Sequence, residues 1–353
     1  MKIGISIGDI NGIGLEVLIK CFTDKRMYNY VTPILYGSAK IVAYHRNIVK
    51  ASEFQYYNIN DTRKAVSNKL NVINCWDENV NISLGKATDE SAKFATISLE
   101  RMCNDLKSGF LDGIVTLPIN KHLMKKAGFR FDGHTEYLEN KFGGDSLMFL
   151  ISDDLRVATL TNHVPVSQVS SLITKELIDK KLRLLNQTLI VDFGIERPNI
   201  AVLGLNPHAG DGGMLGQEEE TIIRPAIIEA KKKGINVAGP YPADGFFGSA
   251  NFKKFDAILA MYHDQGLIPF KALTFDTGVN YTAGLSIVRT SPDHGTAYDI
   301  AGQNIASEKS LRKSILMACD IIKNRQEYHE SRANQLVKQR PADIGDEDEI
   351  LVE

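Results

Sequence analysis

Residues 255–306 read FDAILAMYHDQGLIPFKALTFDTGVNYTAGLSIVRTSPDHGTAYDIAGQNIA, and this stretch indicates the fold class. The apolar run over residues 257–262 is short enough to be a buried strand, and it ends directly before His263. Five polar side chains follow between further short apolar segments: Lys271, Asn280, Arg289, Asp293 and His294. Because ligand sites of open α/β folds form beyond the carboxyl ends of the strands, this pattern favours an α/β protein with a site at a sheet edge.

The rest of the chain alternates between strand-like and helix-like segments. We expect strands over residues 2–7, 32–36, 112–117, 155–161 and 199–205, and helices over residues 89–107, 174–189 and 218–233. Strands that alternate with helices imply right-handed crossovers and mainly parallel pairing. The sequence therefore predicts an α/β protein with mainly parallel sheets, and its 353 residues suit two domains or one large unit.

Composition limits the class of partner. A formal net charge of -2 gives no electrostatic reason to expect nucleic acid or a membrane surface as a partner. No run of about 18 apolar residues predicts a transmembrane helix, and the N-terminus lacks the apolar core of a signal peptide. The four cysteines are far apart, which is typical of reduced thiols in a cytoplasmic protein.

Three histidines follow three of the expected strands. His163, His208 and His263 each come just after the last apolar residue of a separate strand. Since parallel strands end at one edge of a sheet, we expect these side chains to lie near one another. Neutral imidazole is the commonest nitrogen ligand of metals, and three such ligands with an open position are typical of a catalytic metal site. Any one of them alone would more often be a structural histidine.

Three further segments could bind phosphate groups or a nucleotide. The glycine-rich turn over residues 8–14 is either a phosphate loop or a tight strand-to-helix turn, and it lacks the spacing of the known phosphate motifs. His134 and Thr135 open a helix, where they either bind phosphate or serve as an ordinary N-cap. The glycines of the loop over residues 294–304 would allow a nucleotide to approach the backbone closely.

The ordered motifs along nearly the whole chain resemble those of the 4-hydroxythreonine-4-phosphate dehydrogenases of pyridoxal phosphate biosynthesis. They are GDINGIGLE, DGIVTLPINK, GHTEYL, TNHVPVSQV, GLNPHAGDGG, GPYPADGFF, MYHDQGLIPFK and GVNYTAGLSIVRTSPDHGTAYDIAG. The last motif is also similar to the nucleotide-binding loop of the isocitrate and isopropylmalate dehydrogenases, which form the wider fold family.

The resemblance implies a homodimer of chains with two α/β/α domains and a cleft between them. The first domain would comprise residues 1–130 and 296–345. The second, residues 131–295, would carry the metal ligands and the dimer interface, and residues 346–353 would form an acidic tail.

The resemblance also assigns ligands to individual residues. A divalent metal, most often zinc, with magnesium, cobalt and manganese as alternatives, would be shared across the dimer interface by His163, His208 and His263. The phosphorylated substrate would contact His134, Thr135, Lys271, Asn280 and Arg289. The cofactor, NAD or NADP, would lie along His294, Gly295, Thr296, Ala297 and Asn304.

The implied reaction is oxidation of the secondary alcohol of 4-hydroxythreonine 4-phosphate, followed by decarboxylation to 3-amino-2-oxopropyl phosphate. A metal acting as a Lewis acid suits both steps. Either Lys271 or Asp244 would transfer the proton, and the sequence does not choose between them.

The chain departs from the family pattern in two places, and these leave other functions open. Residues 9–16 read DINGIGLE where the family usually has DPAGIGPE, and Gly245 stands where the family often has Thr. One alternative is therefore a related dehydrogenase of another phosphorylated hydroxy acid, such as threonate or erythronate 4-phosphate. More distant alternatives are a phosphate acyltransferase, whose fold is related, and a non-catalytic binding protein.

Overall fold

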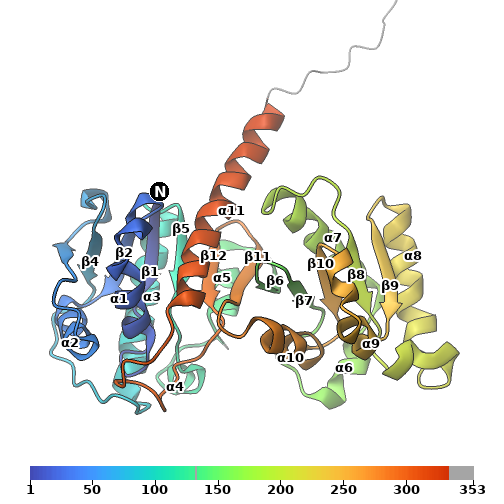
Figure 1. Ribbon diagram of the computed structural model, residues 1–353, viewed down its shortest axis with the longest axis horizontal. Coiled ribbons are helices and arrows are strands. Elements are labelled where there is room, and N and C mark those ends of the chain that lie inside the picture. Colours follow the sequence, from blue (N-terminus) through green and yellow to red (C-terminus); the bar gives the residue numbers. More distant parts are fainter. Residues whose placement is uncertain (132, 334–353) are drawn as a thin grey trace, which may run out of the picture.

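A single mixed sheet runs through the molecule (Figure 1). The computed structural model describes residues 1–131 and 133–333, so the predicted acidic tail (346–353) and the predicted end of the first domain (334–345) lie outside the described residues. The sheet order is β3-β4-β2-β1-β5-β12-β11-β6-β7-β10-β8-β9. Its strands are β1 (Lys2–Ser6), β2 (Thr32–Gly37), β3 (Tyr56–Ile59), β4 (Leu70–Asn74), β5 (Gly113–Thr116), β6 (Gly144–Ile151), β7 (Arg156–Thr159), β8 (Ile200–Leu203), β9 (Val237–Tyr241), β10 (Ala257–Ala260), β11 (Val279–Leu285) and β12 (Arg289–Pro292).

Most neighbouring strands pair in parallel, which confirms the predicted α/β class. In the part of the chain that the structure describes, the antiparallel pairs are β12 with β11, β11 with β6, and β6 with β7. These pairs join the N-terminal and C-terminal halves of the sheet into one surface. The domain boundaries expected near residues 130 and 296 stay a prediction.

Helices cover both faces of the sheet (Figure 1). The α-helices are α1 (Gly14–Thr23), α2 (Ala39–Val49), α3 (Asp89–Lys107), α4 (Lys121–Lys126), α5 (His134–Phe142), α6 (Val166–Leu172), α7 (Lys175–Val191), α8 (Arg224–Lys232), α9 (Ala243–Gly248), α10 (His263–Thr274) and α11 (Lys309–Ala333). Short 3-10 segments are η1 (Lys25–Asn29), η2 (Thr62–Lys64), η3 (Pro207–Gly213) and η5 (Asn251–Lys254), and a π-helical turn is η4 (Glu219–Ile223).

Alternate strand residues supply two cores, one on each face. In β2, Ile34 belongs to the core under α3, whereas Leu35 belongs to the core under α1 and α11. In β10, Ile258 packs with α9 and α10, whereas Leu259 packs with α7 and α8. Because successive side chains of a strand point to opposite faces, a strand covered by helices on both sides is a continuous apolar run. These runs are the sequence signal on which the strand predictions rest.

The helix expected over residues 218–233 is interrupted. Residues 219–223 form the π-helical turn η4, and the α-helix α8 begins only at Arg224. Pro225 has no backbone N–H to donate to the carbonyl four residues before it, so the regular α-helical bonding fails at this point. Single π-helical turns of this kind are frequent at functional sites.

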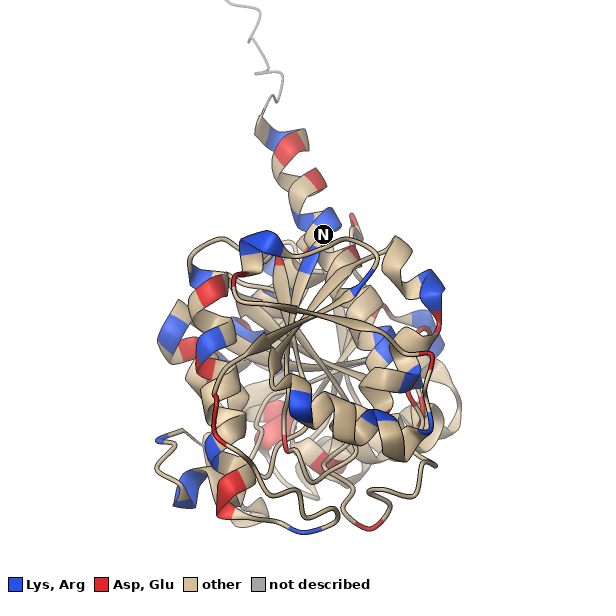
Figure 2. Ribbon diagram, turned by 90° about the vertical axis from the view of Figure 1, so that its left-hand side faces the viewer, with Lys and Arg blue, Asp and Glu red and all other residues tan. Residues whose placement is uncertain are grey.

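The three strands that precede the histidines are neighbours in the sheet. β10 lies between β7 and β8 and pairs with both in parallel. The carboxyl ends of these three strands therefore lie at the same edge of the sheet. None of the helices in the described residues is long and apolar enough to cross a membrane. On the side formed by the first half of the chain, cationic and anionic residues are interspersed along the helices (Figure 2).

Candidate active site

A pocket lined by cations opens where β5 and β12 end and β11 begins. It has a volume of about 210 Å³ and combines three of the predicted substrate residues with His134 and with the start of the predicted cofactor loop. The charged, imidazole and amide side chains that line it are Lys121, His134, Lys271, Asn280, Arg289, Asp293 and His294. Four of the five predicted substrate residues therefore meet in one place, while Thr135 lies beside them in the first turn of α5 and is half-buried.

Arg289 is the central cation of this pocket. Its side chain is buried, and its Nη2 and Nε donate to Thr116 Oγ1 at 2.6 and 3.1 Å, while Nη1 donates to Thr282 Oγ1 at 2.9 Å. These partners are neutral, so they orient the guanidinium without cancelling its charge. Burial lowers the pKa of Arg289 to about 10, against a smaller opposing effect of Glu136. The guanidinium stays protonated at neutral pH and can pair with an anion.

His134 completes the anion-binding geometry. Its Nδ1 lies 3.3 Å from Nη2 of Arg289. Burial, followed by the charges of Arg289 and Lys121, lowers the pKa of His134 well below its ordinary value. The imidazole is therefore neutral, and because the guanidinium can only donate, Nδ1 accepts and Nε2 carries the proton. His134 thus offers an N–H donor, and the helix α5 behind it begins at Gly133 without a side-chain cap.

Lys271 and Asp293 form an ion pair at the rim of the pocket. Their Nζ and Oδ1 atoms are 3.4 Å apart, and Lys271 is about half exposed, whereas Asp293 is nearly buried. Burial raises the pKa of Asp293, although the charge and hydrogen bond of Lys271 oppose the shift. Asp244, the other predicted proton carrier, is exposed on α9 and is not among the residues that line this pocket.

Two of the three predicted metal ligands are adjacent. The rings of His163 and His263 have centroids 5.6 Å apart, and both line a hollow of about 190 Å³ with Asn162 and Tyr262. A further cavity, lined by Lys121, Glu136, Asn162 and His163, shares two of these residues with this hollow and Lys121 with the cationic pocket. Within residues 1–131 and 133–333, no group of three His, Cys, Asp or Glu side chains of one chain is arranged to hold a metal ion.

The chemistry of the histidine pair fits a divalent metal. Nδ1 of His263 lies 2.7 Å from Oδ1 of Asp264, so the carboxylate can accept a hydrogen bond from the Nδ1–H. In this tautomer Nε2 carries no proton and can donate its electron pair to a metal. Metal-binding histidines commonly have such a carboxylate partner. His208 lies in η3, outside the residues that line the hollow, and has a left-handed backbone with φ 54°.

The predicted cofactor loop contains two buried acceptor atoms without a hydrogen-bond partner. Nε2 of His294 and Oδ1 of Asn304 are both buried and unpaired. His294 Nδ1 lies 3.0 Å from the carbonyl of Gly295, and Asn304 Nδ2 donates to the carbonyl of Val49 at 3.3 Å. Burial lowers the pKa of His294, so its ring is neutral and Nε2 can accept. Hydroxyl or amino groups of a nucleotide would satisfy both atoms, so the loop fits a nicotinamide cofactor.

The glycine-rich turn over residues 8–14 packs against this loop. The N–H of Ile13 at the start of α1 donates to the carbonyl of Thr296 at 3.0 Å. A Cβ atom at Gly12 would lie 2.7 Å from the same carbonyl oxygen, so only glycine allows this contact. The buried carboxylate of Glu16 lies in the first helical turn and pairs with Lys20. The tight-turn interpretation is therefore the one that the structure supports.

Several functional contacts had no signal in the sequence. Thr116 and Thr282 hold Arg289, Lys121 lines two of the cavities, and Tyr298 donates to Asp9 across the cofactor loop. Threonine in a strand ordinarily reflects β-propensity. For Lys121 the one hint was its position four residues after the expected strand over residues 112–117.

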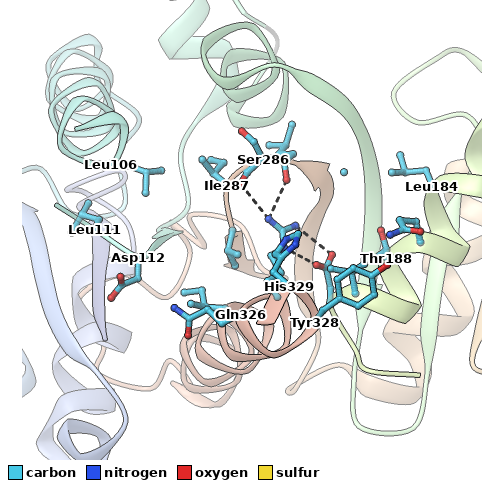
Figure 3. Close-up of a pocket in the computed structure, with 18 of the residues that line it drawn as sticks. Leu106, Leu111, Asp112, Leu184, Thr188, Ser286, Ile287, Gln326, Tyr328 and His329 are labelled. Atoms are coloured by element: carbon cyan, nitrogen blue, oxygen red, sulfur yellow. Dashed lines mark hydrogen bonds and ion pairs between the residues drawn. The ribbon is translucent and has the colours of Figure 1, made fainter. Parts of the chain in front are cut away.

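A larger cavity lies away from these residues. It lies beside the C-terminal half of α11 and has a volume of about 840 Å³. Figure 3 shows the residues that line it, among them Tyr328 and His329. Its cation, Arg325, already donates to Asp192 Oδ1 at 2.7 Å and to the carbonyl of Leu285 at 3.2 Å. Since this guanidinium is satisfied by the protein, the cavity lacks the available charge that distinguishes the smaller pocket.

The fold and the site together describe an α/β protein with a cationic pocket beside a pair of adjacent imidazoles. The family model "Pyridoxal phosphate biosynthetic protein PdxA" matches residues 29–318, and the chain belongs to this family. A 4-hydroxythreonine-4-phosphate dehydrogenase of Bacteroides thetaiotaomicron is 50% identical over 100% of this chain and 97% of that protein.

Other comparisons agree on the family. The crystal structure of a 4-hydroxythreonine-4-phosphate dehydrogenase from Burkholderia phymatum has a TM-score of 0.74 and 35% identity, and it covers 91% of this chain and 98% of that one. A relative from Oceanobacillus iheyensis with the name "Putative D-threonate 4-phosphate dehydrogenase" is 37% identical over 90% of this chain and 97% of that protein.

Proposed function

We propose that this protein is an NAD(P)-dependent dehydrogenase that oxidises 4-hydroxythreonine 4-phosphate and yields 3-amino-2-oxopropyl phosphate after decarboxylation, in pyridoxal phosphate biosynthesis. The observation that carries the proposal is the buried Arg289, which has neutral partners and lies 3.3 Å from a neutral His134. Family membership and the names of the relatives indicate which phosphorylated substrate we expect. The cytoplasmic location expected from the sequence stays a prediction.

The phosphate or carboxylate groups of the substrate bind to Arg289 and the Nε2–H of His134. A guanidinium that is already oriented by two threonines loses little entropy when an anion binds, and burial strengthens the attraction. Lys121, Lys271 and Asn280 offer further donors around the same pocket, and Thr135 stands beside them. The pocket is complementary to a small dianionic molecule.

His163, His208 and His263 hold a divalent metal at a site that is shared with the partner subunit. When bound, the metal acts as a Lewis acid toward the oxygen atoms of the substrate. His163, one of the two adjacent imidazoles, lines a cavity together with Lys121, which also lines the cationic pocket. Asp264 orients His263. Zinc is the metal we expect, since three neutral imidazoles with an open position are a common zinc arrangement.

The nicotinamide cofactor lies along residues 294–304. His294 and Gly295 line the substrate pocket, and Asn304 lies at the far end of the loop. The unpaired acceptor atoms of His294 and Asn304 bind hydroxyl or amino groups of the cofactor. Thr296 and Ala297 lie between them, and Thr296 is held by the turn at Ile13. Lys271 transfers the proton of the alcohol, because it lines the pocket whereas Asp244 does not.

A homodimer would cover the apolar surface around the histidines. In the described part of the chain, many of the exposed large apolar side chains belong to α6, α10 and the residues that follow η3. They are Val166, Leu172, Met214, Leu215, Ile268, Leu273 and Phe275. An exposed apolar surface of this kind marks a protein interface. Its position next to His163, His208 and His263 fits a metal site shared between two subunits.

A second candidate is oxidation of threonate 4-phosphate. Gly245 is exposed, and a Cβ atom there would meet nothing within 4 Å, so this position imposes no steric selection. One relative at 37% identity bears the name of that activity. Both activities share the same anion pocket and metal.

The deciding experiment compares NAD(P)H formation with 4-hydroxythreonine 4-phosphate and with threonate 4-phosphate, before and after chelation and after metal is restored. We expect chelator-sensitive turnover of the amino substrate. Turnover of threonate 4-phosphate alone would select the second candidate. Turnover of neither by the metal-loaded dimer would contradict both.

A further inference from the structure

The turn that carries His208 has an unusual backbone. Five consecutive residues, 208–212, are left-handed, with φ values of 54°, 51°, 82°, 43° and 63°. His208, Ala209 and Asp211 are not glycine, and the left-handed region costs about 1–2 kcal/mol for each such residue. Strained backbone of this kind persists only where its surroundings hold it, so the structure must contain a group that holds this turn.

Gln217, whose Nε2 donates to the carbonyl of Gly213 at 2.8 Å, is one such group, and Glu219 is another. The side chain of Glu219 is fully buried, with a relative exposure of 0%. Oε1 accepts hydrogen bonds from the backbone N–H groups of Leu205 and Asn206, both at 2.7 Å, and Oε2 accepts from Asn206 Nδ2 at 2.9 Å. All three donors are uncharged amide groups, and they belong to the residues that lead into the turn. A buried carboxylate is costly unless its oxygens are paired in this way.

The turn also packs tightly around the carboxylate. A Cβ atom at Gly210 would lie 2.7 Å from Oε2, and one at Gly204 would lie 3.1 Å from Oε1. The two ends of the loop therefore approach Glu219 from both sides. No larger side chain could occupy position 210 without displacing the carboxylate. The contact defines where the backbone of residues 204–210 lies.

The π-helical turn η4 explains how Glu219 reaches this position. Glu219 is the first residue of η4, which precedes Pro225 and α8. Its neighbour Glu220 is half-exposed and pairs with Arg224 on the surface at 3.0 Å. The carboxylate of Glu219 is therefore buried beside the turn that carries His208, whereas that of Glu220 lies at the protein surface.

We propose that Glu219 is a positioning residue of the metal site, because its carboxylate holds the His208 turn in the conformation that presents the imidazole. The proposal rests on the proposed function, since it takes His208 as a metal ligand. A ligand that is held in place before binding avoids the entropy cost of ordering a loop when the metal binds. Loss of the carboxylate therefore weakens metal binding without touching the metal ligands.

The test compares Glu219→Gln with Glu220→Gln, which makes the same chemical change on the surface. Metal-free dimers are titrated with Zn²⁺ by calorimetry and with Co²⁺ by its d–d absorption, and the melting temperature is recorded. We expect Glu219→Gln to bind metal about 10- to 100-fold more weakly, as when other supporting partners of metal ligands are removed. Its Co²⁺ spectrum should change, while Glu220→Gln should match the wild type.

A purely structural role predicts a different result. In that case Glu219→Gln lowers the melting temperature, while the folded protein keeps the wild-type metal affinity and Co²⁺ spectrum, and the proposal is overturned. If Glu219→Gln does not fold, Gly210→Ala takes its place, because it displaces the carboxylate without removing its charge. Wild-type metal affinity in Gly210→Ala would equally overturn the proposal.

His208→Ala separates this proposal from the proposed function. If His208→Ala binds metal weakly and Glu219→Gln binds normally, His208 remains a ligand and only the role of Glu219 is wrong. If His208→Ala itself binds metal with wild-type affinity, the ligand assignment in the proposed function fails, whatever Glu219 does.

Discussion

The hydroxyl of Tyr298 donates a hydrogen bond to Oδ2 of Asp9 at 2.5 Å, although the two residues are 289 positions apart in sequence. Asp9 also accepts from Ser91 Oγ and from the N–H of Asn11. The first turn of the chain, the start of α3 and the predicted cofactor loop therefore meet at one buried carboxyl group. Burial raises the pKa of Asp9, and the three donors oppose that shift.

Tyr298→Phe should raise the KM for the nicotinamide nucleotide about fivefold, because a hydrogen bond of about 1 kcal/mol that positions the loop is lost. The KM for the phosphorylated substrate should stay unchanged, since Arg289 and His134 are not touched. Initial-rate kinetics with each substrate varied in turn measure both values. Tyr30→Phe, on an exposed side chain, is the control. Equal increases in both KM values would contradict a role confined to the cofactor loop.

Arg289→Lys should raise the KM for the phosphorylated substrate about 10- to 100-fold. An ammonium group cannot bind Thr116, Thr282 and an anion in the fixed geometry of a guanidinium, and hydrogen bonds to charged groups contribute about 1.5–3 kcal/mol. Arg26→Lys, which is exposed, is the matched control. Direct binding of the substrate to the metal-loaded dimer measures the effect. A variant that binds like wild type would exclude Arg289 from the anion site.

Lys271→Met should reduce kcat about 10²- to 10⁴-fold with metal still bound, since that is the usual contribution of a positioned acid or base. Asp244→Asn should keep kcat within tenfold, because Asp244 lies on exposed α9. Turnover and metal content are measured on the same samples. The reverse pattern would assign the proton transfer to Asp244.

Mixed dimers test the shared metal site. His163→Ala and His208→Ala dimers should each be inactive. If the two histidines of one site come from different subunits, a heterodimer of the two variants contains one intact site and should recover about half of the wild-type activity. A heterodimer without activity would place His163 and His208 of each site on the same chain.

Acid should destabilise the protein partly through His45. Its Nε2 lies 2.9 Å from the carbonyl of Ile10, and burial lowers the pKa of His45 to about 4, from an ordinary value of 6.5. The unfolded chain binds the proton more readily, so stability is full above pH 6.5 and falls as the pH decreases toward 4. From pH 7 to 5.5 the loss from this residue is about 1 kcal/mol.

Urea unfolding at pH 7 and 5.5 measures that loss. In His45→Gln the dependence on pH should be smaller by about 1 kcal/mol than in the wild type. Identical pH dependence in both proteins would show that His45 does not titrate differently in the folded state.

Helices and strand ends whose position depends on residues close in sequence could be predicted from the sequence. The helix α3 begins after Thr88, whose Oγ1 accepts a hydrogen bond from the N–H of Ser91 at 3.2 Å. Gly109, which has a φ of 75°, follows the end of the helix. A threonine before the first turn of a helix and a glycine after its last turn are local signals of this kind. The strand ends near His163 and His263 were found in the same way.

The remaining features depend on contacts between distant segments. The antiparallel pairing of β6 with β11 joins Phe149 to Tyr281, and no local pattern specifies that register. Likewise, the hydroxyl of Thr116 reaches Arg289 only after the chain has returned to the first half of the sheet. The sequence therefore indicated that Arg289 is a candidate anion-binding residue, but it did not indicate which side chains orient Arg289.

The position of β12 beside β5 has a consequence for biosynthesis on the ribosome. About 170 residues separate these two strands, and they take roughly 10–30 s to synthesise at about 5–20 residues per second. During that interval one edge of β5 has no partner, and the face that α11 covers is open to solvent. The nascent N-terminal half therefore emerges as an incomplete sheet that needs protection from association. The anion pocket forms only when nearly the whole chain has been translated.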